Sequence, residues 1–247
     1  MTVRFHKEFL AYEYMRATPD GAHLPPVLFL GGFKSDMMGT KALFLKENCA
    51  ERGQAFLRFD YSGHGQSKGR FEDGTIGLWT AQAMEMLGLL PAGWCILVGS
   101  SMGGWIALSL LLRAPERVAG VIGIAAAPDF TQSIEPRMTP AQHAEMARHG
   151  YIAVASSYGA EPYIYTKALI EDGRAHVLLD RVHSIGVPLI LLQGRKDDAV
   201  PWQTAENIKL AFPGPRTEII YREAGDHRLS GPDDLECLGT VLKQLSF

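Results

Sequence analysis

Short apolar segments alternate with longer segments of helical periodicity along most of this 247-residue chain. Such alternation is typical of a mostly parallel β-sheet whose strands are joined by helices that cover its faces. The run over residues 95–98 is apolar throughout, as expected for a strand covered on both sides. We therefore predict an α/β fold with a central sheet of eight strands, at residues 4–8, 11–16, 26–30, 55–59, 95–98, 118–125, 189–192 and 218–221.

The helices expected between and after these strands cover residues 36–52, 75–90, 102–113, 202–212 and 235–245. Asp36 is placed to cap the first helix, because its carboxylate can accept hydrogen bonds from free N–H groups at a helix start. Gly53 is placed to end it, since glycine adopts the left-handed conformation found after helices. The helix over residues 102–113 has almost no polar face, so we expect it to be buried.

Residues 131–184 interrupt this alternation. A connection between parallel strands needs far fewer residues, and this stretch is helix-like in parts and contains four tyrosines. We interpret it as a small helical lid inserted into one α/β core, which residues 1–130 and 185–247 form. An ordinary long surface excursion is the alternative interpretation.

Composition and charge exclude several classes of function. The formal net charge of −3 provides no basic surplus for binding nucleic acid, and no apolar run is long enough to span a membrane. The three cysteines, Cys49, Cys95 and Cys237, are far apart and lack the spacing of a metal site. No glycine-rich nucleotide-binding motif is present, so we expect neither a metal nor a cofactor.

The first residues lack the apolar core of a signal peptide and include Glu8 and Glu13, which disfavours a transit peptide. A cytoplasmic location is therefore expected. The sequence indicates no oligomeric state.

The residues GSSMG at positions 99–103 match the pattern G-x-S-x-G. They follow the apolar strand at residues 95–98 and precede the buried helix, which is the setting in which this pattern presents a nucleophilic serine. The tight turn lifts the Ser101 hydroxyl to a helix N-terminus, where free N–H groups stabilise developing negative charge. The alternative is a helix-capping serine, a role that Ser100 could fill.

A serine hydroxyl is a poor nucleophile until a base takes its proton. When G-x-S-x-G presents the serine, an acid and then a histidine follow it along the chain. Of the eight histidines, only His227 lies after both Ser101 and the strand at residues 189–192. It lies in a loop after the last strand, from which an imidazole can reach the carboxyl edge of the sheet.

Asp197 and Asp198 both follow the strand at residues 189–192, and each is a candidate for the third member. Asp197 is favoured, because G-x-x-D-x-x-V-P over residues 194–201 is the usual form of this loop. Its carboxylate would accept the second N–H of the imidazole, fix the tautomer and stabilise the imidazolium ion. Asp198 would then be a cap or a solvated charge.

Attack on a carbonyl carbon leaves negative charge on oxygen, which two backbone N–H groups usually stabilise. One belongs to the residue after the nucleophile, here Met102, and the other to the loop after the third strand. In that loop we expect Phe33 to be the donor, with Gly32 as the alternative.

These motifs resemble the α/β-hydrolase fold, and more closely the α/β-hydrolase domain-containing protein ten family. The similar segments are GGFKSDMMGTKA at 31–42, RFDYSGHGQS at 58–67, VGSSMGGW at 98–105, VPW at 200–202 and DHR at 226–228. Known members of that family are mitochondrial and act as S-depalmitoylases and acyl-glucuronide esterases. The resemblance implies a triad on Ser101, Asp197 and His227, and it is weakest in residues 131–181.

We therefore hypothesise a serine hydrolase that cleaves small-molecule carboxylic esters or thioesters through an acyl-serine intermediate. Tyr158, Tyr163 and Ile164 of the lid are candidate substrate-binding residues, with packing inside the lid as the alternative. Two other functions are considered. One is carbon–carbon bond hydrolysis of a ring-cleavage product by the same residues, and the other is a non-catalytic binding protein on this fold.

Overall fold

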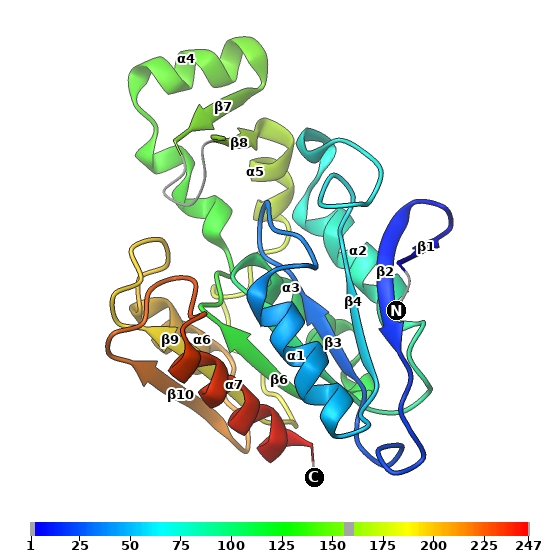
Figure 1. The fold of residues 1–247 in the computed structure, drawn as a ribbon. Helices are drawn as coiled ribbons and strands as arrows, with labels where there is room; N and C mark the ends of the chain where they lie inside the picture. Colours follow the sequence, from blue (N-terminus) through cyan, green and yellow to red (C-terminus); the bar gives the residue numbers. More distant parts are fainter. Residues whose placement is uncertain (1–2, 156–160, 247) are drawn as a thin grey trace.

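A computed structural model describes residues 3–155 and 161–246 of the chain. Its centre is an eight-stranded sheet with the order β1-β2-β4-β3-β5-β6-β9-β10 (Figure 1). Strand β2 pairs antiparallel with both of its neighbours, and the remaining pairs are parallel. The strands are β1 (Arg4–His6), β2 (Leu10–Met15), β3 (Val27–Leu30), β4 (Phe56–Phe59), β5 (Cys95–Ser100), β6 (Val118–Ile124), β9 (Leu189–Gly194) and β10 (Thr217–Arg222). The prediction of a mostly parallel eight-stranded sheet is confirmed.

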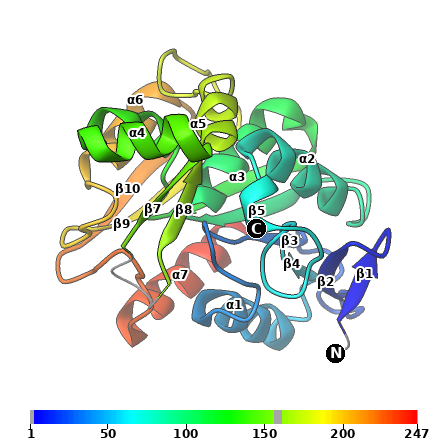
Figure 2. The ribbon, with the colours of Figure 1, turned by 90° about the horizontal axis from the view of Figure 1, so that it is seen from above.

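Helices cover both faces of this sheet, which is why its central strands are apolar on both sides (Figure 2). One face packs against α1 (Thr40–Glu51) and α7 (Pro232–Leu245). The other packs against α2 (Ile76–Leu87), α3 (Met102–Arg113) and α6 (Gln203–Ala211). Most of α3 is buried, as its lack of a polar face predicts. Across the described ranges, no helix combines the length and apolar character needed to cross a bilayer.

The start of α1 differs from the prediction. The helix begins at Thr40 with Gly39 as its N-cap residue, so Asp36 does not cap it. Instead the Asp36 carboxylate accepts the N–H of Met38 at 2.8 Å, and this local turn satisfies its acceptor before the helix starts. The predicted end is confirmed, since the helix stops at Glu51 and Gly53 has a φ of 63°.

Residues 131–184 are only partly helical, whereas the sequence predicts a helical insertion. They contain α4 (Pro140–His149) and α5 (Lys167–Arg174), and also an antiparallel hairpin of β7 (Tyr151–Val154) and β8 (Tyr163–Thr166). Tyrosine and isoleucine dominate both hairpin strands, and such residues fit a pleated surface well. The hairpin and α4 project above the carboxyl ends of the central strands (Figure 1). The division into core and lid stays a prediction.

The described part of the chain also contains four short 3-10 helices. They lie at Phe71–Asp73, Pro115–Arg117, Phe130–Ser133 and Glu135–Arg137.

Candidate active site

Ser101 stands at the tip of the sharp turn between β5 and α3. Its φ of 53° and ψ of −118° lie where a residue with a side chain is strained. The turn is too tight for larger neighbours: a Cβ on Gly99 would lie 2.2 Å from the Gly103 carbonyl oxygen, and one on Gly103 2.0 Å from that of Leu30. Ser100 ends strand β5 and is not at the helix cap. The G-x-S-x-G segment therefore has the geometry that exposes a serine at a sheet edge.

The loops after β9 and β10 bring a carboxylate and an imidazole together. Nδ1 of His227 lies 2.9 Å from Oδ2 of Asp197, whose side chain is fully buried. Oδ1 of Asp197 accepts the N–H groups of Ala199 at 3.0 Å and Val200 at 2.7 Å. Nε2 of Gln193 donates to Oδ2 at 3.1 Å. These bonds fix the carboxylate, so it can orient the imidazole.

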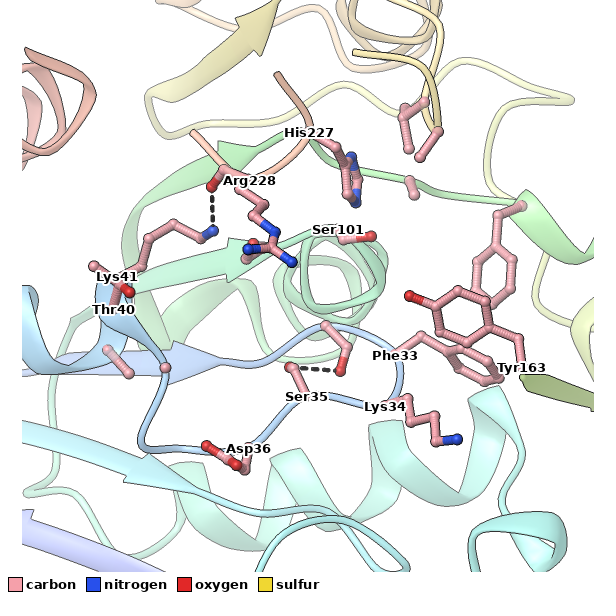
Figure 3. A pocket seen from close by; sticks show the side chains of 18 of the residues that line it. Phe33, Lys34, Ser35, Asp36, Thr40, Lys41, Ser101, Tyr163, His227 and Arg228 are labelled. Atoms are coloured by element: carbon pink, nitrogen blue, oxygen red, sulfur yellow. Dashed lines mark hydrogen bonds between the residues drawn. The ribbon is translucent and has the colours of Figure 1, made fainter. Parts of the chain in front are cut away.

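Ser101 and His227 line the same pocket, which has a volume of about 340 Å³. In Figure 3 the His227 ring extends from its loop toward Ser101. The volume falls within the usual range for small-molecule sites. Among the described residues, no group of three His, Cys, Asp or Glu side chains is arranged to hold a metal ion. The pocket therefore exposes a serine hydroxyl and an imidazole, and the buried Asp197 carboxylate contacts the imidazole without lining the pocket.

The two candidate oxyanion donors flank this serine. In the described part of the chain, the backbone N–H groups of Phe33 and Met102 have no hydrogen-bond acceptor. Met102 is the first residue of α3, and Phe33 lies in the loop after β3. That loop runs against the nucleophile turn, because a Cβ on Gly32 would lie 3.4 Å from the Ser101 Cβ. Both N–H groups are therefore available to a ligand.

The predicted substrate-binding residues differ in whether they line the pocket. Tyr163 lines the pocket, whereas Ile164 does not, because alternate side chains of a strand point to opposite faces. Tyr165, the next residue on that face of β8, lines the pocket as well, and burial raises the pKa of its hydroxyl to about 12. Tyr158 lies outside the described residues. Of these β8 residues, Tyr163 and Tyr165 therefore line the pocket and Ile164 does not, while substrate binding by any of them stays a prediction.

Sequence reasoning missed a cationic side of the pocket, formed by Lys34, Lys41 and Arg228. Nζ of Lys41 donates to the backbone carbonyl of Arg228 and lies 3.4 Å from Oγ of Ser230 (Figure 3). Burial lowers the pKa of Lys41 to about 8, although the nearby carboxylate of Asp226 raises it. Lys41 thus ties the start of α1 to the loop that carries the imidazole. The two segments are 187 residues apart in the sequence, so no local pattern indicates this contact.

Comparisons with known proteins agree with this fold. A protein-family model described as alpha/beta hydrolase fold matches residues 25–168. The palmitoyl-protein thioesterase ABHD10, mitochondrial, of Mus musculus is 34% identical over 237 residues, which are 96% of this chain and 78% of that protein. The human (Homo sapiens) protein of the same name is also 34% identical over 237 residues, which are 96% of this chain and 76% of that protein.

Two solved structures are similar over nearly the full chain. A putative hydrolase from Agrobacterium vitis S4 is 40% identical with a TM-score of 0.92, covering 96% of this chain and 93% of that one. Alpha/beta hydrolase domain-containing protein 10 from mouse is 32% identical with a TM-score of 0.87, covering 99% and 97%. With its eight-stranded sheet and the serine turn after β5, this chain belongs to the α/β-hydrolase family and is a homologue of the ABHD10 palmitoyl-protein thioesterases.

Proposed function

We propose that this protein is a serine hydrolase that cleaves carboxylic esters or thioesters through an acyl-serine intermediate. The hydrogen bond between His227 and Asp197 carries the proposal. In this bond one imidazole nitrogen is the donor, and the role proposed for the other nitrogen is to accept the Ser101 proton. The pocket shared by Ser101 and His227 and the similarity to palmitoyl-protein thioesterases support it.

In the proposed reaction, Oγ of Ser101 attacks the carbonyl carbon while Nε2 of His227 takes its proton. The N–H groups of Phe33 and Met102 stabilise the resulting oxyanion. The imidazolium then protonates the departing alcohol or thiol, and the acyl group stays on Ser101. A water molecule, deprotonated by His227, attacks this acyl-enzyme; the bond to Oγ breaks, the carboxylic acid leaves, and the imidazolium returns the proton to Oγ of Ser101.

We infer that residues 131–184 form a lid, whose Tyr163 and Tyr165 contact the acyl group. Together with Phe33 and Phe130 they give the pocket an aromatic wall suited to an apolar chain. The names of the ABHD10 relatives favour thioester and ester chemistry over carbon–carbon bond cleavage. A cytoplasmic location stays a prediction, while those relatives are described as mitochondrial.

A nitrophenyl ester with a short acyl chain tests the proposal. The wild-type protein is expected to release a burst of nitrophenol as Ser101 is acylated. Ser101→Ala should abolish the burst and lower kcat by about 10⁴-fold or more, whereas Ser184→Ala, at an exposed site outside the pocket, should behave as wild type. A fluorophosphonate probe should label the wild type and not Ser101→Ala. Full turnover by Ser101→Ala, or an unlabelled and inactive wild type, would contradict the proposal.

A further inference from the structure

His64 is a buried histidine that the proposed reaction does not use. It follows strand β4, and only 4% of its surface is exposed. Nδ1 lies 3.1 Å from the carbonyl oxygen of Ser62, and Nε2 lies 3.1 Å from the backbone nitrogen of Lys34. Since a carbonyl oxygen only accepts hydrogen bonds, Nδ1 carries the proton and Nε2 accepts the N–H of Lys34.

The surroundings hold the ring neutral and in one orientation. Burial lowers the pKa of the His64 imidazole to about 4, so Nε2 keeps its lone pair at neutral pH. The rings of Tyr61, Phe71 and Trp79 surround it, with centroids 5.6, 5.1 and 5.1 Å away. Nε1 of Trp79 donates to the same Ser62 carbonyl at 3.2 Å. The acceptor offered to Lys34 is therefore rigidly placed.

Nε2 of His64 binds the turn that contains Phe33, the candidate oxyanion donor. The N–H of Ser35 bonds to the carbonyl oxygen of Gly32 at 3.2 Å, which closes the turn around Phe33 and Lys34. Lys34 has a φ of 57°, which is uncommon for a residue with a side chain. Rotation of the peptide between Phe33 and Lys34 would turn the Lys34 N–H away and leave the buried Nε2 of His64 without this donor.

The same turn is also held from the lid. The Phe33 ring stacks on Tyr165 with centroids 5.5 Å apart and an interplanar angle of 11°. Nζ of Lys34 donates to the Pro162 carbonyl oxygen at 2.9 Å and pairs with Glu161 at 3.0 Å. Those contacts fix side chains of the turn, whereas the bond from Lys34 to the imidazole fixes its backbone.

We propose that His64 is a positioning residue: it holds the Phe33–Lys34 peptide and thereby fixes the backbone of Phe33, whose own N–H is directed at the oxyanion. The inference rests on the proposed ester or thioester hydrolysis. The imidazole touches neither substrate nor Ser101 in this role and transfers no proton. It acts through the backbone of Lys34, one residue beyond the donor.

Two substitutions separate the hydrogen bond from the space that the ring fills. His64→Phe keeps a planar ring but removes the acceptor, and His64→Gln restores an acceptor near the place of Nε2. Loss of an oxyanion donor lowers kcat by about 10²–10³-fold, so a misdirected donor in His64→Phe should lower it by about 10–100-fold. KM should stay within about 2-fold, because the N–H acts mainly in the transition state. His64→Gln should recover most of kcat.

A trifluoromethyl ketone forms an oxyanion on Ser101 and reports on this donor directly. Its inhibition constant should rise in His64→Phe by the same factor by which kcat falls, and recover in His64→Gln. A merely structural role would instead lower kcat and the unfolding temperature together and leave the inhibition constant of the correctly folded fraction unchanged. That pattern, or wild-type values in His64→Phe, would overturn the inference.

Nitrogen NMR of the wild-type protein gives an independent readout in case His64→Phe does not fold. The His64 ring should stay neutral with its proton on Nδ1 at pH 6, and a charged ring or a proton on Nε2 would overturn the inference. An inactive wild-type protein would instead contradict the proposed function, which keeps the two failures distinct.

Discussion

The Asp197 carboxylate accepts hydrogen bonds from two backbone N–H groups on one oxygen and from Gln193 and His227 on the other. Each partner needs an acceptor, so the site is built for a carboxylate and not for an amide. A group held this firmly can keep the imidazole in one tautomer throughout a reaction. The adjacent Asp198 is exposed, and the N–H groups of Ala199 and Val200 donate to Asp197 instead.

We predict that Asp197→Asn lowers kcat by about 10³–10⁴-fold, because an amide N–H facing Nδ1 of His227 favours the wrong tautomer. Asp198→Asn removes one negative charge at the neighbouring residue and should leave kcat within about 2-fold of wild type. Steady-state kinetics with a nitrophenyl ester checks both variants. A large loss in Asp198→Asn and none in Asp197→Asn would reverse the assignment.

A buried ion pair joins β2 to β4, and its arginine also binds the loop that follows β3. Arg58 is fully buried, with Nη2 2.8 Å from Oε2 of Glu13 and Nη1 2.6 Å from the carbonyl oxygen of Met37. Asp60, two residues further along the chain, accepts the N–H of Met37 at 2.6 Å. Arg58 in β4 and Asp60 just after it therefore bind the C=O and the N–H of Met37. These two bonds limit how far the loop after β3 can move.

The ionisation of Glu13 depends on this pairing. Burial by itself raises the pKa of the Glu13 carboxyl, but hydrogen bonds from Arg58 and Lys46 outweigh that effect and lower it below 4.5. A lowered pKa in the folded state means that the pair contributes stability above the unfolded value near 4.5, and that this contribution is lost as the pH falls through the folded value.

We predict that Arg58→Met lowers the free energy of unfolding by about 3 kcal/mol at pH 7, because it leaves a buried carboxylate without its main partner. Urea unfolding measures this, and the difference from wild type should shrink as the pH falls below 4.5 and through the lowered pKa of Glu13. The double variant Glu13→Leu/Arg58→Met should recover part of the loss.

Arg216→Met removes a more exposed ion pair, with Glu218, and should cost no more than about 1 kcal/mol. Equal effects of Arg58→Met and Arg216→Met would show that burial of the pair is unimportant.

The pocket is formed where the α/β core meets residues 131–184. The Phe33 ring of the core packs against Tyr163 and Tyr165 of β8, with centroids 5.8 and 5.5 Å apart, and against Phe130 at 5.6 Å. Both parts line the pocket, so under the proposed function residues 131–184 help to set the space available to a substrate. Differences in this segment between relatives would then change the acyl group accepted without changing the reactive residues.

We predict that Tyr165→Ala raises the ratio of kcat/KM for an eight-carbon ester over a four-carbon ester by about 5-fold or more, because the space that the ring occupied can bury extra methylene groups. Tyr151→Ala, at an exposed site on β7 outside the pocket lining, should leave that ratio unchanged. A panel of nitrophenyl esters provides the measurement. An unchanged ratio in Tyr165→Ala would show that the acyl chain does not reach this wall.

Local sequence patterns predicted the framework well, because they reflect short-range physics. The run at residues 95–98 indicated a strand covered on both faces. Gly53 indicated the end of α1, because glycine readily adopts a positive φ, here 63°. The start of α1 was misjudged, since Asp36 can satisfy its carboxylate equally well in a turn as at a helix cap. The hairpin of β7 and β8 was missed, because each strand has only four residues and so gives a weak local signal.

The sequence by itself determined the order of the strands and helices of the central sheet, the tight turn at Ser101 and the place of His227 after the last strand. Each of these follows from neighbours within a few residues or from order along the chain. Only the tertiary structure decided that Asp197 and not Asp198 meets the imidazole, that His64 accepts the N–H of Lys34, and that Tyr165 lines the pocket while Ile164 does not. Those contacts join residues about 30 or more positions apart, and their geometry depends on how the loops and strands pack, which no local pattern encodes.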